Sequence, residues 1–135
     1  MIMKQDSSGP KKSGPISFAA DGMHIWVDHR RGVGGDEGVT FDVTEGSDGT
    51  GARILRFDCF SRTPHYHIGS SGRDAVHDMN AEGITDPVRW TLDQLKTRLP
   101  ALVKEAGFEA IAESIDQNVI ASRLSQLEKD ILAKV

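Results

Sequence analysis

The sequence predicts an α+β domain, in which an antiparallel meander of four or five strands is followed by two or three helices, the last one long. Three observations predict this fold. Residues 16–68 alternate apolar and polar side chains, which is typical of strands with one buried face. From residue 87 onward the apolar residues instead repeat every three or four positions, as on one side of a helix. A length of 135 residues suits a single domain.

The composition is typical of a soluble globular protein. Hydrophobic residues make up 38% of the chain and charged residues 27%, and the net charge is −4. This mild acidity argues against nucleic-acid binding through a broad basic face. No apolar run approaches the ~18 residues of a membrane span. The first residues lack the apolar centre of a signal peptide, so we expect a cytoplasmic protein without a membrane segment.

Residues 1–14 combine Lys, Ser, Gly and Pro with few apolar side chains. Such a segment buries too little surface to offset the entropy lost on ordering. We therefore expect a flexible N-terminal tail at residues 1–14 and a single α+β domain at residues 15–135.

The first half of the domain contains the strands. The Gly-rich segment 31–38 is followed by a strand and not by a helix, which indicates a hairpin loop and not a dinucleotide-binding fingerprint. A second break, GSDGTG at residues 46–51, is a turn by composition. The expected strands are residues 16–19, 23–29, 39–45, 52–60 and 65–68.

The second half begins with a helix start signal, because Asp86 is a favoured N-cap residue and Pro87 a favoured first-turn residue. Pro100 lies inside the apolar repeat that follows. It removes a backbone hydrogen bond, so we expect it to kink or split the helix. Gly107 supplies a stop, and the last helix is predicted from Phe108 to the end of the chain.

The last helix carries two apolar stripes. Val119 and Ile120 are neighbours, so the apolar face turns by ~100° between the stripes. The second stripe is narrow, as in a seam between two helices, and predicts residues 118–135 as the dimerisation helix of a homodimer. A helix packed within its own domain is the alternative. Trp90 lies off the apolar stripe of its helix, which indicates either an interface or a loop that covers it. The expected interface residues are Trp90, Ile120, Leu124, Leu127 and Ile131.

One cluster predicts chemistry, in the segment RILRFDCFSRTPHYHIG at residues 53–69. If residues 61–64 form the hairpin loop, Asp58 lies opposite His67. The alternation then places Cys59 on the apolar face, where a thiol behaves as a small hydrophobe and is a poor nucleophile. The opposite face carries the candidate site residues Arg56, Asp58, His65 and His67.

Three interpretations of this cluster remain open. Two histidines two positions apart on a strand, together with a carboxylate, can bind a divalent metal such as zinc or manganese, which makes His65, His67 and Asp58 the candidate ligands. The same histidines can instead act as a metal-free acid–base pair on a phosphodiester, with Arg56 stabilising the anion. The third interpretation is a structural polar face without chemistry.

The segments RFDCFSRTPHYHIG and DPVRWTLDQLKTRLPALVKEAGF resemble a family of small bacterial proteins of unknown function, in which a PHYH hairpin precedes a helix with WTL and RLP motifs. The resemblance spans about residues 53–112, and implies an α+β fold and a bacterial origin but no activity. The hairpin also has a looser similarity to TumE-type toxins, which are regarded as ribonucleases. Residues 69–78 depart from the pattern of those toxins, so their activity is not transferred to this chain.

Two functions follow from these observations. The first is a non-enzymatic, homodimeric interaction protein with an unknown protein partner. The second is a phosphodiesterase-like hydrolase, metal-dependent or acid–base, that uses the Asp58, His65 and His67 hairpin. A toxin-type ribonuclease belongs to this second class, although the net negative charge disfavours a nucleic-acid substrate.

Overall fold

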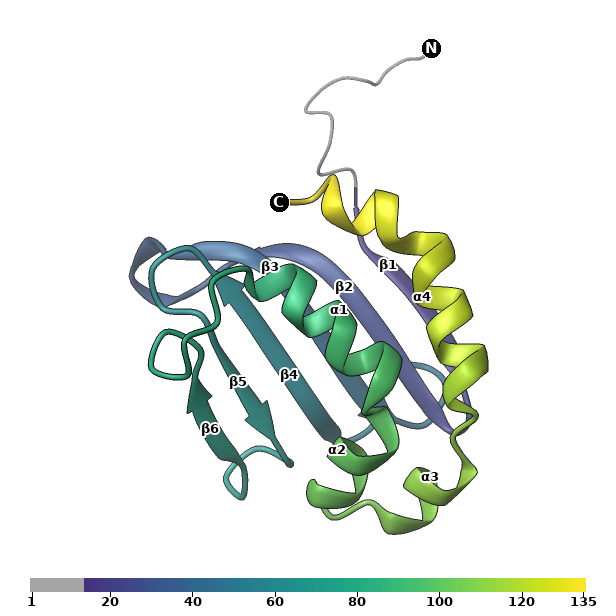
Figure 1. Cartoon of the computed structure of the whole chain (residues 1–135). Helices are drawn as coiled ribbons and strands as arrows, with labels where there is room; N and C mark the ends of the chain where they lie inside the picture. Colours follow the sequence, from purple (N-terminus) through teal and green to yellow (C-terminus); the bar gives the residue numbers. More distant parts are fainter. Residues whose placement is uncertain (1–13) are drawn as a thin grey trace.

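The computed structural model describes residues 14–135, in which one antiparallel sheet is covered on one face by helices (Figure 1). The tail predicted for residues 1–14 lies outside the described residues, apart from Gly14. Sequence neighbours pair throughout, in the order β1-β2-β3-β4-β5-β6. The strands are β1 (Ile16–Ala20), β2 (Met23–Arg31), β3 (Glu37–Glu45), β4 (Arg53–Phe60), β5 (His65–Ile68) and β6 (Ala75–Asp78). The helices are α1 (Pro87–Thr97), α2 (Leu99–Glu105), α3 (Glu109–Ser114) and α4 (Gln117–Leu132).

The meander and the order of strands and helices confirm the predicted fold class, but the counts were too low. The described residues form six strands and four helices, against the expected four or five and two or three. Strand β6 was missed because its sequence, AVHD, is short and its one large apolar residue, Val76, is exposed. The last helix is divided at Ile115, whose extended backbone precedes the N-cap Asp116. Neither Pro nor Gly marks that break.

Pro100 has the predicted effect on the first helix. Helix α1 ends at Thr97 and α2 begins at Leu99, with Pro100 in its first turn, where the missing amide hydrogen costs nothing. At the start of α1, the side chain of Asp86 accepts a hydrogen bond from the backbone amide of Arg89, as expected of an N-cap.

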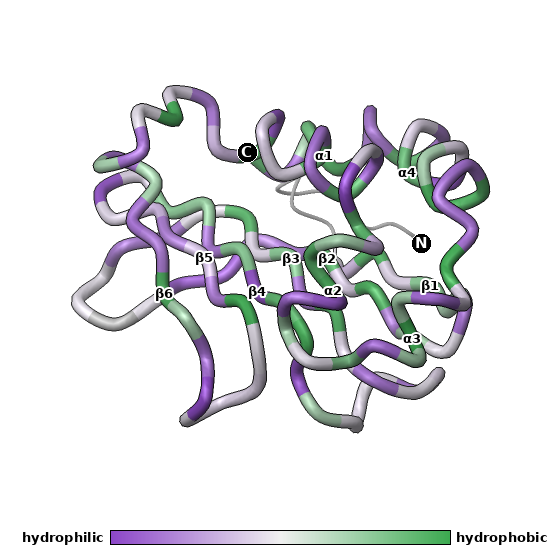
Figure 2. Tube along the Cα trace, turned by 60° about the horizontal axis from the view of Figure 1, so that its bottom comes forward, coloured by the Kyte–Doolittle hydropathy of each residue, from purple (hydrophilic) through white to green (hydrophobic). Residues whose placement is uncertain are grey.

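The hydrophobic core lies between the sheet and the helices. Alternate residues of the central strands point to this face, and Ile25, Phe41 and Phe57 are fully buried. Helices α1 and α4 form a layer over this face, as Figure 2 shows from another direction. Their contributions to the core include Leu92 and Leu95 of α1 and Ile120, Leu124 and Ile131 of α4.

The opposite face of the sheet carries no helix among residues 14–135, and we call it the open face. Its side chains are mostly polar, because the alternation that buries one set of residues directs the intervening set outward. Cross-strand pairing arranges them in rows. One row joins Trp26, Asp42, Arg56 and His67, and the next joins Thr40, Asp58 and His65.

The β4–β5 loop is held by one buried carboxylate, that of Asp36. It accepts hydrogen bonds from the backbone amides of Arg62 and Thr63, and from the hydroxyls of Ser61 and Thr63, at 2.7 to 3.1 Å. Asp36 itself follows the short 3-10 turn at Val33–Gly35. The contacts tie this turn to the loop and thereby set where β5 begins.

The loop geometry corrects the predicted register of the hairpin. Asp58 pairs with His65, and not with His67, because the turn is longer than the four residues that we expected. Cys59 and Phe60 continue to pair with β3, but they have no partner on β5, which begins at His65. The register differs from the expected one by two residues, and an even shift leaves each side chain on its predicted face.

In residues 14–135, every helix is too short or too polar to cross a bilayer.

We predict that Asp36→Asn lowers the urea midpoint of unfolding at neutral pH. Burial by itself raises the pKa of Asp36, but the hydrogen bonds from Thr63, Arg62 and Ser61 outweigh it and hold the pKa well below its usual range. A carboxyl whose pKa is lowered by folding contributes stability above its unfolded pKa and loses it as the pH falls. The wild type should therefore lose stability more steeply than the variant between about pH 5 and pH 3.

The matched control is Asp93→Asn on α1, because that aspartate is exposed. Its urea midpoint at neutral pH should stay at the wild-type value. Equal midpoints for wild type and Asp36→Asn would show that the carboxylate does not hold the loop.

Candidate metal centre on the open face

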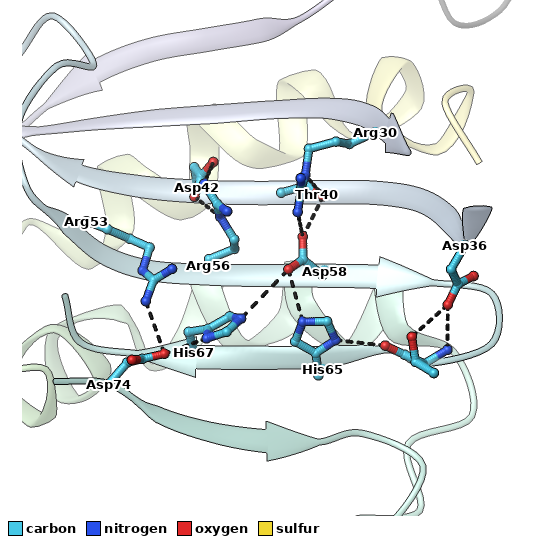
Figure 3. Close-up of polar contacts among 11 residues, drawn as sticks. Arg30, Asp36, Thr40, Asp42, Arg53, Arg56, Asp58, His65, His67 and Asp74 are labelled. Carbon is cyan, nitrogen blue, oxygen red and sulfur yellow. Dashed lines mark hydrogen bonds and ion pairs between the residues drawn. The ribbon is translucent and has the colours of Figure 1, made fainter. Parts of the chain in front are cut away.

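Asp58 is a nearly buried carboxylate in the middle of the open face, with 2% of its surface exposed. Its Oδ1 accepts hydrogen bonds from Thr40 Oγ1 at 2.8 Å and from Arg30 Nη2 at 3.0 Å (Figure 3). Burial by itself raises the pKa of Asp58, but hydrogen bonds from His65, Thr40 and Arg30 outweigh it and hold the pKa well below its usual range. The group is therefore a carboxylate at neutral pH.

The second oxygen of Asp58 faces both hairpin histidines. Its Oδ2 lies 3.2 Å from Nε2 of His65 and 3.9 Å from Nε2 of His67. The two imidazole rings lie close together, with centroids 5.1 Å apart. Asp58, His65 and His67 each offer one ligand atom, and these three atoms lie within 4.8 Å of one another. The structure thus contains an Asp/His/His group of the kind that holds a metal ion.

Each histidine is oriented by a hydrogen bond at its other nitrogen. Nδ1 of His65 lies 2.8 Å from the carbonyl oxygen of Thr63, and Nδ1 of His67 lies 2.6 Å from Oδ2 of Asp74. Both partners are acceptors at neutral pH, so each Nδ1 must carry the hydrogen. In the neutral imidazoles, Nε2 then has a free lone pair directed toward Asp58.

The surrounding charges are paired. Arg53 Nη2 lies 3.1 Å from Asp74 Oδ2, and the hydrogen bond from His67 holds the pKa of Asp74 below its usual range. Arg56 donates to both oxygens of Asp42, from Nε at 2.8 Å and from Nη2 at 3.1 Å. This fork raises the pKa of Arg56. When the ring of His65 is protonated, its Nε2 can also donate to Asp58, and this hydrogen bond raises the pKa of His65.

All four candidate residues of the hairpin lie on the open face, as the alternation predicted. Asp58, His65 and His67 converge, and Arg56 is the neighbour of His67 across the β4–β5 pair. Cys59 lies on the core face, where burial raises the pKa of its thiol to about 12 and its sulfur lies 3.5 Å from Thr91 Oγ1. It is not positioned as a nucleophile.

The residues expected at a subunit interface pack within the chain. Ile120, Leu124 and Ile131 are fully buried in the core, and Leu127 is partly buried against it. The ring of Trp90 lies on the sheet, with its centroid 5.1 Å from that of Tyr66 and 6.2 Å from that of Phe57. The helix stripe that suggested a dimer seam is therefore filled by contacts inside one chain.

Sequence reasoning missed Arg30, Thr40 and Asp74, which complete the site. The alternation of β2 and β3 could have placed Arg30 and Thr40 on one face, but their proximity to Asp58 depends on the strand order. Asp74 lies outside any strand, in the β5–β6 loop, and only the fold brings it to His67. His77, on β6, points to the other face, where it stacks on Tyr66.

A cavity of about 820 Å³ lies elsewhere. It opens on the helix side of the sheet, between the start of α1, the end of α4, the start of β3 and the end of β4. Its lining includes Val39, Val88 and Leu132 but none of the Asp/His/His group. The polar side chain of His29 in this cavity is paired, with Glu37 Oε1 at 2.8 Å and the carbonyl oxygen of Lys134 at 3.1 Å.

A family model described as "Domain of unknown function (DUF7700)" matches residues 17–131. The match covers the whole sheet except the first residue of β1, and all four helices except the last residue of α4. It therefore includes the Asp/His/His group. No curated protein and no solved structure matches the chain.

We predict that Thr40→Val destabilises the fold by about 2 kcal/mol, because the buried carboxylate of Asp58 loses a hydrogen bond and valine keeps the shape. Thr44→Val is the matched control on the same face of β3, since the buried hydroxyl of Thr44 has no hydrogen-bond partner among residues 14–135. That substitution should change the free energy of unfolding by no more than about 0.5 kcal/mol. Urea unfolding of the three proteins measures both values, and equal losses for the two variants would contradict the role of Thr40.

Proposed function

The chain belongs to the DUF7700 family, and from its site we propose that it is a metal-dependent hydrolase of phosphate esters, with Asp58, His65 and His67 as ligands of one divalent ion. One observation carries the proposal. The hydrogen bonds at both Nδ1 atoms leave the two Nε2 lone pairs directed at the same carboxylate oxygen.

Three electron-rich atoms that face one another require a positive charge between them. With both imidazoles neutral, Asp58 Oδ2 and the two Nε2 atoms repel one another. A proton on His65 relieves one of these contacts, whereas a divalent cation relieves all of them. Two imidazoles and one carboxylate suit zinc, and also manganese or iron.

The residues behind the ligands support the same interpretation. In metal sites, a ligating histidine commonly donates its other N–H to a carboxylate or a backbone carbonyl, which fixes the ring and its tautomer. His67 has the carboxylate of Asp74 and His65 the carbonyl of Thr63. Thr40 and Arg30 hold the third ligand, through the oxygen of Asp58 that does not face the histidines.

The position of the group favours a catalytic site over a structural one. Structural zinc sites are closed by four protein ligands, whereas catalytic sites use three and keep a position for water or substrate. Here three ligands lie on the open face, and the side chains of His65 and His67 are 28% and 19% exposed. A divalent ion at such a site activates water and polarises a phosphoryl oxygen.

The chain's own cations would bind the substrate. The Nη1 group of Arg56 makes no hydrogen bond with the described residues, and it lies in the row that contains His67. It can donate to a phosphoryl oxygen while Asp42 holds the rest of the guanidinium. In the reaction, the oxygen of water bonds to phosphorus, the bond from phosphorus to the leaving oxygen breaks, and a proton of the water goes to the leaving group.

The other function expected from the sequence, a homodimeric interaction protein, stays a prediction. Its main basis was the apolar stripe of the last helix, and Ile120, Leu124 and Ile131 are buried within one chain. Light scattering on the whole chain measures the oligomeric state directly. A shortened chain would not, because removal of α4 would expose the core.

We predict that the chain binds about one zinc or manganese ion, and that the loaded protein hydrolyses methyl p-nitrophenyl phosphate. The double variant His65→Ala/His67→Ala should lose both properties, since it removes two of three ligands. Bound metal is measured by isothermal titration and by elemental analysis, and hydrolysis by the absorbance of p-nitrophenol.

His24→Ala is the matched control, because His24 lies on the same sheet but outside the Asp/His/His group. It should keep the stoichiometry and affinity of the wild type. Equal metal binding by the wild type and the double variant would overturn the site, and metal binding without hydrolysis would overturn the hydrolase.

A second prediction concerns Asp74, which contacts His67 but is not a ligand in the proposed site. Asp74→Asn should weaken metal binding by about 10- to 100-fold, as loss of an orienting carboxylate does in other metal sites. Asp42→Asn, a carboxylate of the same face that pairs with Arg56, should leave the affinity unchanged. Metal titration of both variants tests this, and similar effects of the two substitutions would indicate a general loss of negative charge.

A further inference from the structure

A second feature of the open face lies beside the Asp/His/His group. It is a hollow of about 310 Å³, at the small end of the range of ligand pockets. Two of its lining residues border the proposed metal centre, because Arg30 hydrogen-bonds Asp58 and Arg56 is paired with His67. The lining residues used below are Trp26, Arg30, Asp42 and Arg56.

Trp26 is the aromatic wall of this hollow, and its surroundings differ from those of Trp90. Trp90 packs against Phe57 and Tyr66 on the core face. The indole of Trp26 makes no ring contact, cation–π contact or side-chain hydrogen bond within residues 14–135. Its cross-strand neighbours, Ser17 and Asp42, provide no apolar cover. A large aromatic ring on an open sheet face is typical of a binding surface.

One polar group of the hollow can bind the edge of a planar ring. The carboxylate of Asp42 keeps acceptor capacity beyond its two bonds from Arg56. A heterocycle that stacks on Trp26 and carries a donor on its edge can hydrogen-bond this carboxylate.

The distance between the hollow and the proposed metal centre is comparable to the length of one nucleotide. Trp26, Asp42, Arg56 and His67 form a single cross-strand row. Three interstrand spacings separate the backbone of its two ends, roughly 14 Å. Arg56 and Asp42 lie between them, with Arg56 beside the phosphate position.

We propose that the substrate is a nucleotide phosphodiester, whose base stacks on Trp26 in this hollow while its phosphate lies at the Asp58, His65 and His67 group. The proposal rests on the proposed function for the catalytic step. It favours a single nucleotide unit over a long nucleic acid, because Arg30, Arg53 and Arg56 are already paired with carboxylates. A long polyanion needs several unpaired cations along its path.

The test compares two esters that share the p-nitrophenyl phosphate bond, thymidine 5′-(p-nitrophenyl phosphate) and methyl p-nitrophenyl phosphate. Water hydrolyses either one to p-nitrophenol and the corresponding monoester. The metal-loaded full chain should prefer the thymidine ester in kcat/KM. Trp26→Leu should reduce this preference about tenfold, mainly through KM, because stacking on the base is lost.

The matched control is Trp90→Phe on the core face, which should keep the preference of the wild type. In that background Trp26 is the only tryptophan. Thymidine 5′-monophosphate should therefore quench its fluorescence directly, with or without metal.

The outcomes separate this proposal from the proposed function. Hydrolysis of the methyl ester without preference for the thymidine ester, together with no quenching, would overturn the nucleotide site and leave the hydrolase intact. Quenching by the nucleotide in a protein that binds no metal would support the base site and overturn the hydrolase.

Discussion

The open face is organised by one requirement, that the nearly buried carboxylate of Asp58 be compensated by neighbouring groups. An uncompensated buried charge is far more costly than most single interactions in a folded protein. Four consecutive strands meet this requirement, since Arg30 lies on β2, Thr40 on β3, Asp58 on β4, and His65 and His67 on β5. A meander is well suited to it, because sequence neighbours are also spatial neighbours and each strand contributes from an adjacent position.

The face of each side chain could be predicted from the sequence, whereas the pairing between strands could not. Period-two alternation places Asp58, His65 and His67 on one face in the expected register and in any register that differs from it by an even number of residues. The actual register depends on Asp36, whose hydrogen bonds to the β4–β5 loop are contacts between segments about 25 residues apart. No local pattern carries that information. The same limit explains why Asp74 was not identified as a partner of His67.

The helices illustrate a second limit. Apolar spacing singled out Ile120, Leu124 and Ile131, which are buried, but it also included Val119, which is exposed, and it could not identify what buries the others. Helix α4 lies over the β1 and β2 side of the sheet (Figure 1), and its Ile120, Leu124 and Ile131 belong to the hydrophobic core of the same chain. Pro100, by contrast, acts through its own backbone, so its effect at the α1–α2 junction could be predicted without knowledge of the fold.

The charge balance of the open face bears on the choice between a structural network and the proposed metal centre. Arg30 pairs with Asp58, Arg53 with Asp74, and Arg56 with Asp42, so these three pairs are neutral without any charge on the histidines. In a purely structural network, one proton on His65 would compensate its contact with Asp58 Oδ2 but would leave the contact of His67 with the same oxygen uncompensated. In the proposed site, a divalent ion held by Asp58, His65 and His67 would give the face a net positive charge. That charge is complementary to a phosphate, which brings its own negative charge to a surface whose arginines are already neutralised.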